Sequence, residues 1–277
     1  MYSRPLAGLS GVSLQQGALS AAVPLGPDWT VGAGAWTFDA SGLLSEKEAI
    51  LGAAYKPSPR WAVGASASYL SHSYSVSGDA LASRDPVFSG ATSKAGVGLG
   101  VGAMFFPREN LSLGLSGRNL NRPNLGLASK DIVPMEVRTG GMLKLSRFSV
   151  LADIGVRDAG SDVADGRQVN WALGGEWQAL QATREQPSLV LRLGLNAEQI
   201  GGGFGLNLGF MRVDYAFSLM ESMLSDSFGG HRLSLSFRFG SGRDADSVKP
   251  RAAAMPRREA PAANDPFDYY QRAGSIR

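Results

Sequence analysis

Apolar and polar positions alternate with a period of two in the last third of the chain, in four segments separated by turns. In the first segment Leu189, Leu191, Leu193 and Leu195 share one face, and polar or small residues lie between them. The other three segments repeat this pattern near residues 203–210, 212–219 and 232–240. A period of two predicts β-strands. An apolar face opposed by arginine, aspartate and glycine is typical of a barrel wall between lipid and a wet interior.

The same alternation continues in the first two thirds of the chain, where glycine and alanine take many of the positions on both faces. It predicts further strands near 10–24, 29–40, 46–56, 61–73, 94–106, 110–119, 135–145, 147–158 and 169–180. With the four segments above, about thirteen strands are visible. Antiparallel barrels of bacterial outer membranes have an even number of strands. We therefore expect thirteen visible strands of a total of fourteen.

The links between the predicted strands alternate between tight and long. Tight links are expected at 26–28, 57–60, 107–110, 146 and 211, and longer ones at 41–45, 74–93, 120–134, 159–168 and 220–230. Two links fit less well, because 181–187 is long for its side and 197–202 is short. Tight periplasmic turns and larger extracellular loops are features of outer-membrane barrels. The predicted fold is all-β, a transmembrane antiparallel up-and-down barrel.

The link pattern also orients the chain. If the long links face outward, the last strand ends in the periplasm, and thirteen strands require the first one to start outside. The first residues, Met1 to Leu6, carry no apolar signal-peptide core. Both features predict that residues 1–240 are an N-terminally incomplete barrel whose first ascending strand is absent from the sequence.

Residues 241–277 differ from the rest in composition. They contain four prolines, several alanines and mixed charges without an apolar period, so they cannot bury a core. We expect a disordered periplasmic tail. Its only aromatic cluster is Phe267, Tyr269 and Tyr270, which is either incidental or a short docking motif for a periplasmic partner.

Composition narrows the possible functions. The chain has no cysteine, which removes disulfides, thiolate metal sites and cysteine nucleophiles. The net charge is +3, and the basic residues are scattered, which disfavours a nucleic-acid partner. His72 and His231 are the only histidines, and neither accompanies a recognisable nucleophile or ligand spacing. The glycine-rich run 200–205 lies in a hairpin and not before a helix. We expect no enzyme activity, cofactor or metal.

Ionisable residues in the predicted strands fall on the face opposite the apolar one. Because charges are costly against lipid, we expect them in the lumen. The candidate lumen polar cluster comprises Glu176, Arg192, Arg212, Asp214, Arg232 and Arg238. Two interpretations remain open, an ion-pair network that fills the interior and a polar path through the barrel. The five tryptophans are expected near strand ends as a membrane-interface girdle; they are Trp29, Trp36, Trp61, Trp171 and Trp177.

Several motifs resemble the PorV/PorQ family of outer-membrane proteins, which is similar to the FadL group of fourteen-stranded barrels. They are the strand and turn at 111–120, Arg-Leu-Gly-Leu-Asn at 192–196, Arg-Val-Asp-Tyr-Ala-Phe at 212–217 and the closing segment 231–240. The resemblance covers roughly residues 8–240 and implies a signal peptide and an N-terminal hatch segment, neither of which stands in this sequence.

Three functional hypotheses follow. The resemblance implies a non-enzymatic outer-membrane barrel that transports hydrophobic molecules or serves a type IX-like protein secretion system, handling secreted cargo. The alternative is a structural barrel that anchors a periplasmic complex through its tail. The third is a soluble β-sandwich or barrel, which requires the apolar faces to point inward.

Overall fold

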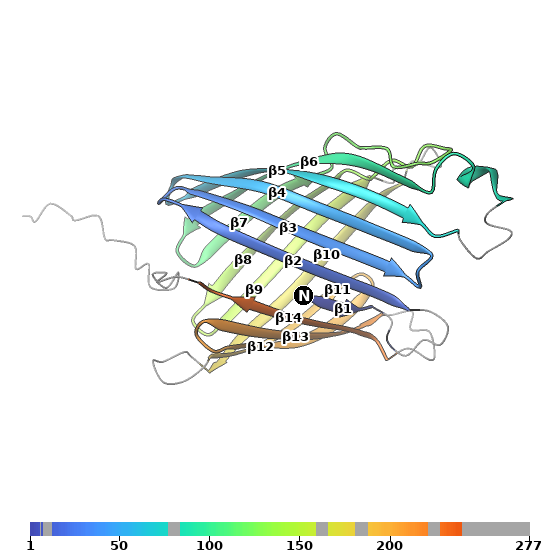
Figure 1. Ribbon diagram of the computed structural model, residues 1–277. Coiled ribbons are helices and arrows are strands. Elements are labelled where there is room, and N and C mark those ends of the chain that lie inside the picture. Colours follow the sequence, from blue (N-terminus) through green and yellow to red (C-terminus); the bar gives the residue numbers. More distant parts are fainter. Residues whose placement is uncertain are drawn as a thin grey trace, which may run out of the picture. The chain divides into compact units, whose positions relative to one another are not determined.

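The computed structural model describes residues 1–5, 7, 13–76, 84–158, 166–180, 188–220 and 228–239. Fourteen antiparallel strands close into a single barrel in chain order (Figure 1). The strands are β1 (Tyr2–Arg4), β2 (Leu14–Leu25), β3 (Trp29–Ala40), β4 (Leu44–Ser58), β5 (Trp61–Tyr74), β6 (Ser93–Arg108), β7 (Leu111–Arg118), β8 (Glu136–Leu145), β9 (Phe148–Asp158), β10 (Arg167–Leu180), β11 (Ser188–Asn196), β12 (Gln199–Asn207), β13 (Met211–Met220) and β14 (Gly230–Phe237). One 3₁₀ turn, η2 (Pro86–Phe88), lies between β5 and β6.

All thirteen predicted strands are present, and the total of fourteen is confirmed, but the fourteenth strand, expected to be absent from the sequence, is formed within it. The remaining strand is β1, which the alternation pattern did not assign because it is only three residues long. It runs antiparallel to both β14 and β2 and closes the barrel between them. Of the first predicted strand, 10–24, residues 10–12 lie outside the described residues, and the structure begins β2 at Leu14.

The alternation separates the two faces of the wall as predicted. Leu19, Leu51 and Leu193 point outward, with 79%, 68% and 73% of their surface exposed. The residues that alternate with the outward-facing ones point to the interior and are half-buried or buried, the latter including Ser68 and Ser149. This arrangement contradicts the soluble sandwich or barrel, which required apolar faces to point inward. An apolar outer belt is the arrangement that a bilayer stabilises.

The two ends of the barrel differ in their links. At the tight-turn end, β2–β3, β4–β5, β6–β7 and β8–β9 join through links of two or three residues. The opposite, long-link end carries the extended links 75–92 and 119–135. The link at 41–45, expected to be long, is a short turn over 41–43 in which Ser41 and Gly42 have positive φ angles of 52° and 72°. Link length therefore distinguishes the ends less regularly than the sequence suggested.

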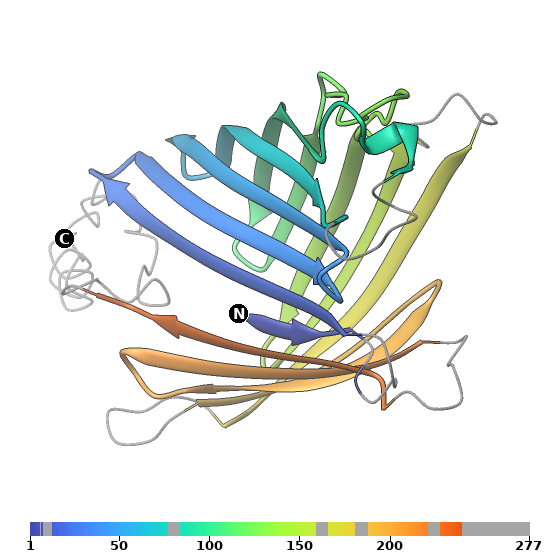
Figure 2. The ribbon, with the colours of Figure 1, turned by 45° about the vertical axis from the view of Figure 1, so that its right-hand side comes forward.

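The closure at β1 is confined to part of the barrel's length. Tyr2 lies opposite Leu233 and Gly17, Ser3 opposite Arg232 and Gln16. The Met1 amino group donates to the Ala18 carbonyl at 2.8 Å. From there toward the tight-turn end, β2 and β14 continue without a described strand between them, and Figure 2 shows the ribbons diverging.

The chain divides into two units, Met1–Phe237 and Arg238–Arg277. The first is the barrel. Of the second, only Arg238 and Phe239 are described, and the tail residues 241–277, including Phe267, Tyr269 and Tyr270, lie outside the described residues.

Candidate functional site

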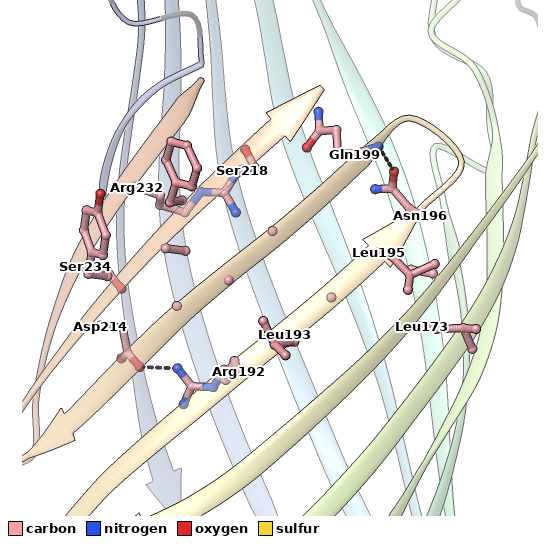
Figure 3. Close-up of a pocket in the computed structure, with 18 of the residues that line it drawn as sticks. Leu173, Arg192, Leu193, Leu195, Asn196, Gln199, Asp214, Ser218, Arg232 and Ser234 are labelled. Carbon is pink, nitrogen blue, oxygen red and sulfur yellow. Dashed lines mark hydrogen bonds and ion pairs between the residues drawn. The ribbon is translucent and has the colours of Figure 1, made fainter. Parts of the chain in front are cut away.

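The lumen wall of β10–β13 carries a chain of ion pairs. Arg192 lies between two carboxylates, with its Nε donating to Glu176 Oε2 at 2.8 Å and its Nη1 donating to Asp214 Oδ1 at 2.7 Å. Arg212 Nε donates to the other oxygen of Asp214, also at 2.8 Å. Four residues of the predicted lumen polar cluster are thus brought together on the inner wall. Figure 3 shows Arg192 reaching toward Asp214 across the intervening strand.

The register of the strands explains this geometry. Glu176 and Arg192 are direct cross-strand neighbours, so their side chains meet on the same face. Asp214 is two strands away from Arg192, and the residue beside it on β12 is Gly205. A Cβ atom at Gly205 would lie 2.5 Å from Asp214 Oδ1 and 3.1 Å from the Arg192 guanidinium nitrogens. The Arg192 guanidinium and the Asp214 carboxylate therefore meet in the space that a side chain at residue 205 would enter.

The two other predicted members do not join these ion pairs in the described structure. Arg232 follows the same face of β14, opposite Ala216 and Ser3, and makes no ion pair with another described residue. It lines a cavity of about 580 Å³ together with Arg192, Arg212 and Asp214. Arg238 was placed in the last strand by its alternation, but β14 ends at Phe237, so Arg238 is not part of the wall. The alternation continues through Phe239, two positions past the last strand pairing at Phe237.

A second internal cavity, of about 740 Å³, lies at the long-link end. Its charged lining includes Glu46 and Glu48 of β4, His72 of β5 and Arg118 of β7. Arg118 Nη2 pairs with Glu48 Oε1 at 2.9 Å, across the barrel's inner surface. His72 Nε2 lies 3.3 Å from Glu46 Oε1, and its Nδ1 lies 3.9 Å from Asp131 Oδ2. Such partly exposed pairs contribute little stability individually, so they shape the lumen more than they hold the barrel.

Apolar side chains line the same cavity, including Trp36, Leu70 and the run Ile132 to Pro134. Trp36 corrects the sequence analysis, which placed it in the membrane girdle. It alternates with the exposed outer residues of β3 and stacks on Phe38 at a centroid separation of 6.3 Å. Trp29 and Trp61, also predicted for the girdle, lie on the outer face near the tight-turn end, where they stack on Tyr55 and Phe105 at 4.7 and 4.4 Å. Nearness to a strand end does not decide which face a residue occupies, whereas alternation does.

Sequence reasoning missed part of this second cavity. Glu46, Glu48 and Arg118 were not included among the lumen candidates, although they stand on the polar positions of predicted strands. The same alternation rule that selected Arg192 would have selected them. The contribution of the link residue Asp131 had no comparable signal, because links carry no period.

Neither histidine forms part of a catalytic arrangement that we can build from the described residues. His72 has the carboxylate neighbours given above, and His231 lies on the outer face, where its Nδ1 is 2.9 Å from the Tyr215 hydroxyl. Among the described residues, no group of three or more His, Asp or Glu side chains could hold a metal ion. In the same part of the chain, no helix is long and apolar enough to cross a membrane.

Comparison with known proteins identifies the fold but no family. No protein-family model and no curated protein sequence matches the chain. Among solved structures, the TodX monoaromatic hydrocarbon channel with its S2 deletion aligns with a TM-score of 0.60 and 16% identity, covering 86% of this chain and 88% of that one. The toluene transporter TodX of Pseudomonas putida aligns at 0.56 with 14% identity, over 84% of both chains. A bacterial polysaccharide outer membrane secretin aligns at 0.50 with 10% identity, over 86% and 97%.

Proposed function

We propose that this protein is a non-enzymatic outer-membrane channel for small hydrophobic molecules. The observation that carries the proposal is the cavity at the long-link end, in which Trp36, Leu70 and Pro134 provide apolar contacts among charged and polar side chains. Ligand sites are typically apolar hollows with a few placed polar groups. The fold it shares with hydrocarbon channels supports the same class of cargo.

The resemblance to the PorV/PorQ family supports a second candidate, an accessory barrel of a type IX-like secretion system. Its support is the sequence motifs at 111–120, 192–196, 212–217 and 231–240, which lie mainly in the wall strands β7, β11, β13 and β14. The structural alternative, a barrel that anchors a periplasmic complex through residues 241–277, rests on the tail's composition. Co-purification with and without that tail tests both, because each requires a bound protein partner.

Uptake of radiolabelled toluene tests the channel. Gram-negative cells that produce the protein in the outer membrane should accumulate toluene faster than cells that produce an unrelated barrel of similar size. Trp36→Asp, which places a charge against the apolar part of the cavity, should reduce this gain. Trp171→Phe on the outer face is the matched control and should leave uptake unchanged, because its side chain points away from the lumen. Equal uptake in protein-producing and control cells would refute the channel.

A further inference from the structure

The link from β7 to β8, residues 119–135, follows the lumen face of β6. Along part of β6 it takes the place of a neighbouring strand. β6 is longer than β7, whose last described pairing with it is Gly117 opposite Val101. Beyond that point, the side-chain amide of Asn121 forms two hydrogen bonds with the backbone of β6, where β7 no longer pairs with it. Its Oδ1 accepts from the Leu99 N–H at 2.9 Å, and its Nδ2 donates to the Val97 carbonyl at 2.7 Å. The Leu120 N–H adds a bond to the Leu99 carbonyl at 3.0 Å.

Leu125 of this link is the most deeply buried apolar side chain among the described residues, with 1% of its surface exposed. It packs on Gly96 of β6, where a Cβ atom would lie 3.0 Å from Leu125 Cδ2 and 3.2 Å from Pro123 Cβ. At Gly98 a Cβ atom would lie 2.5 Å from Asn119 Oδ1. The glycines on the inner face of β6 therefore form a groove that the link fills.

The link is a compact unit with its own internal bonds. The Leu125 N–H donates to the Asp131 carbonyl and the Val133 N–H to the Pro123 carbonyl, both at 2.8 Å. The Asn124 side chain accepts from the Asp131 N–H at 2.9 Å. Such a unit can leave the groove without losing its own structure. Its polar ties to the wall are the Asn121 bonds, the Leu120 N–H bond to the Leu99 carbonyl, the Asp158 N–H bond to the Met135 carbonyl, the Arg122–Asp158 ion pair and the His72–Asp131 contact.

We propose that residues 119–135 form an internal gate whose Leu125 occupies an apolar ligand site on the glycine face of β6. This proposal rests on the proposed channel function and adds to it the position of a binding site and the element that controls access. A hydrophobic molecule takes the groove when Leu125 leaves it, because both bury apolar surface against the same glycines. The displaced link also opens the cavity beside it, which residues 131–134 line on one side.

A disulfide tests the gate directly, because the chain contains no other cysteine. In the variant Gly96→Cys/Pro123→Cys, the two Cβ atoms lie at about 3.2 Å in the closed state, slightly under the usual separation of roughly 3.5–4.5 Å for a disulfide. Oxidation should reduce toluene uptake to the level of cells without the protein, and dithiothreitol should restore it. Uptake that is unchanged after complete oxidation, verified by gel shift, would overturn the gate.

The second measurement does not depend on transport. A single Leu125→Cys variant should react slowly with a membrane-impermeant maleimide and faster when toluene is added, since the ligand displaces residue 125 from the groove. Glu198→Cys, exposed in the link between β11 and β12, is the control and should react at a rate that toluene does not change. Toluene-independent labelling of both positions contradicts the gate. If the unmodified protein gives no uptake but residue 125 still responds to toluene, the channel function fails and the binding site stands.

Discussion

A single glycine determines how the charges of the inner wall connect. Arg192 crosses β12 to reach Asp214 because Gly205 leaves the space open. Asp214 in turn accepts hydrogen bonds from two arginines, Arg192 and Arg212, so it is the branch point of the chain of ion pairs. Two residues therefore determine how the ion pairs of β10–β13 connect: Gly205, which leaves space, and Asp214, which two arginines share.

Gly205→Val should break the contact between Arg192 and Asp214. The added side chain would overlap both groups, and overpacking of this kind costs about 1–3 kcal/mol of unfolding free energy. Gly114→Val is the matched control, since its Cβ atom would meet nothing within 4 Å on another strand of the same barrel. Urea unfolding of the refolded protein in detergent micelles should show a lower midpoint for Gly205→Val only. Equal midpoints for the two variants would contradict the spatial role of Gly205.

Asp214→Asn should destabilise the barrel more than Glu176→Gln. The first change weakens charge-assisted bonds to two arginines and the second a bond to one. Hydrogen bonds to charged groups contribute about 1.5–3 kcal/mol each, and the partial exposure of these side chains places the expected loss at the lower end. The same urea titration measures the order, with Glu198→Gln in a link as the charge-matched control. A larger loss for Glu176→Gln would show that Asp214 is not the branch point.

At the level of elements, the unequal lengths of β6 and β7 determine where the gate docks. The edge of β6 beyond Val101 has no strand partner on that side, and Asn121 supplies the bonds that a strand would make. An unsatisfied backbone group in a dry environment is costly, so this edge requires a partner. The long link is consequently part of the wall's hydrogen bonding as well as a covering of the lumen.

Asn121→Ala should expose the Leu99 amide to solvent. The substitution removes two hydrogen bonds, worth about 2 kcal/mol together, and leaves the internal bonds of residues 123–133 intact. Hydrogen exchange followed by NMR should therefore accelerate at Leu99 more than at Leu125. Asn207→Ala, which removes one turn bond to Gly209 at the opposite end, should leave the Leu99 rate unchanged. Unaltered exchange at Leu99 in Asn121→Ala would argue against the docking contact.

The sequence predicted the strands well and the links poorly, for physical reasons. A period of two survives in thirteen strands because each has one face toward an apolar surrounding, so the signal repeats locally. The strand β1 was not predicted because three residues are too few to show a period. The inward course of residues 119–135 depends on the distant glycines of β6, which no local pattern reports. In the candidate site, alternation identified Arg192 and Asp214, but the space at Gly205 that joins them became visible only from strand register.

For the whole molecule, the decisive property is which face of the wall meets lipid. Trp61 lies on the outer face, stacked on Phe105, whereas Trp36 lies inside against Phe38. In brominated phospholipid bilayers, a variant that retains only Trp61 should be strongly quenched, and one that retains only Trp36 should resist quenching. The same two variants in plain detergent provide the control. Quenching of Trp36 as strong as that of Trp61 would mean that the apolar belt is not the lipid-facing surface.

Closure of the barrel depends on its shortest strand. β1 contacts β14 and β2 through only three residues, and Ser3, at its centre, is 4% exposed and pairs with both neighbours. Along this part of the barrel β1 pairs the edges of β2 and β14, and an unpaired strand edge is costly in a membrane. Ser3→Pro removes a backbone N–H from β1. When samples are heated stepwise and then run on cold SDS gels, the folded, fast-migrating band of this variant should be lost at a lower temperature than that of the original protein. Ser3→Ala keeps the N–H and should retain nearly the original transition. If both variants lose the folded band at the same temperature, β1 does not hold the barrel closed. The pairing of β2 with β3 and of β14 with β13 would then be enough to keep the barrel folded.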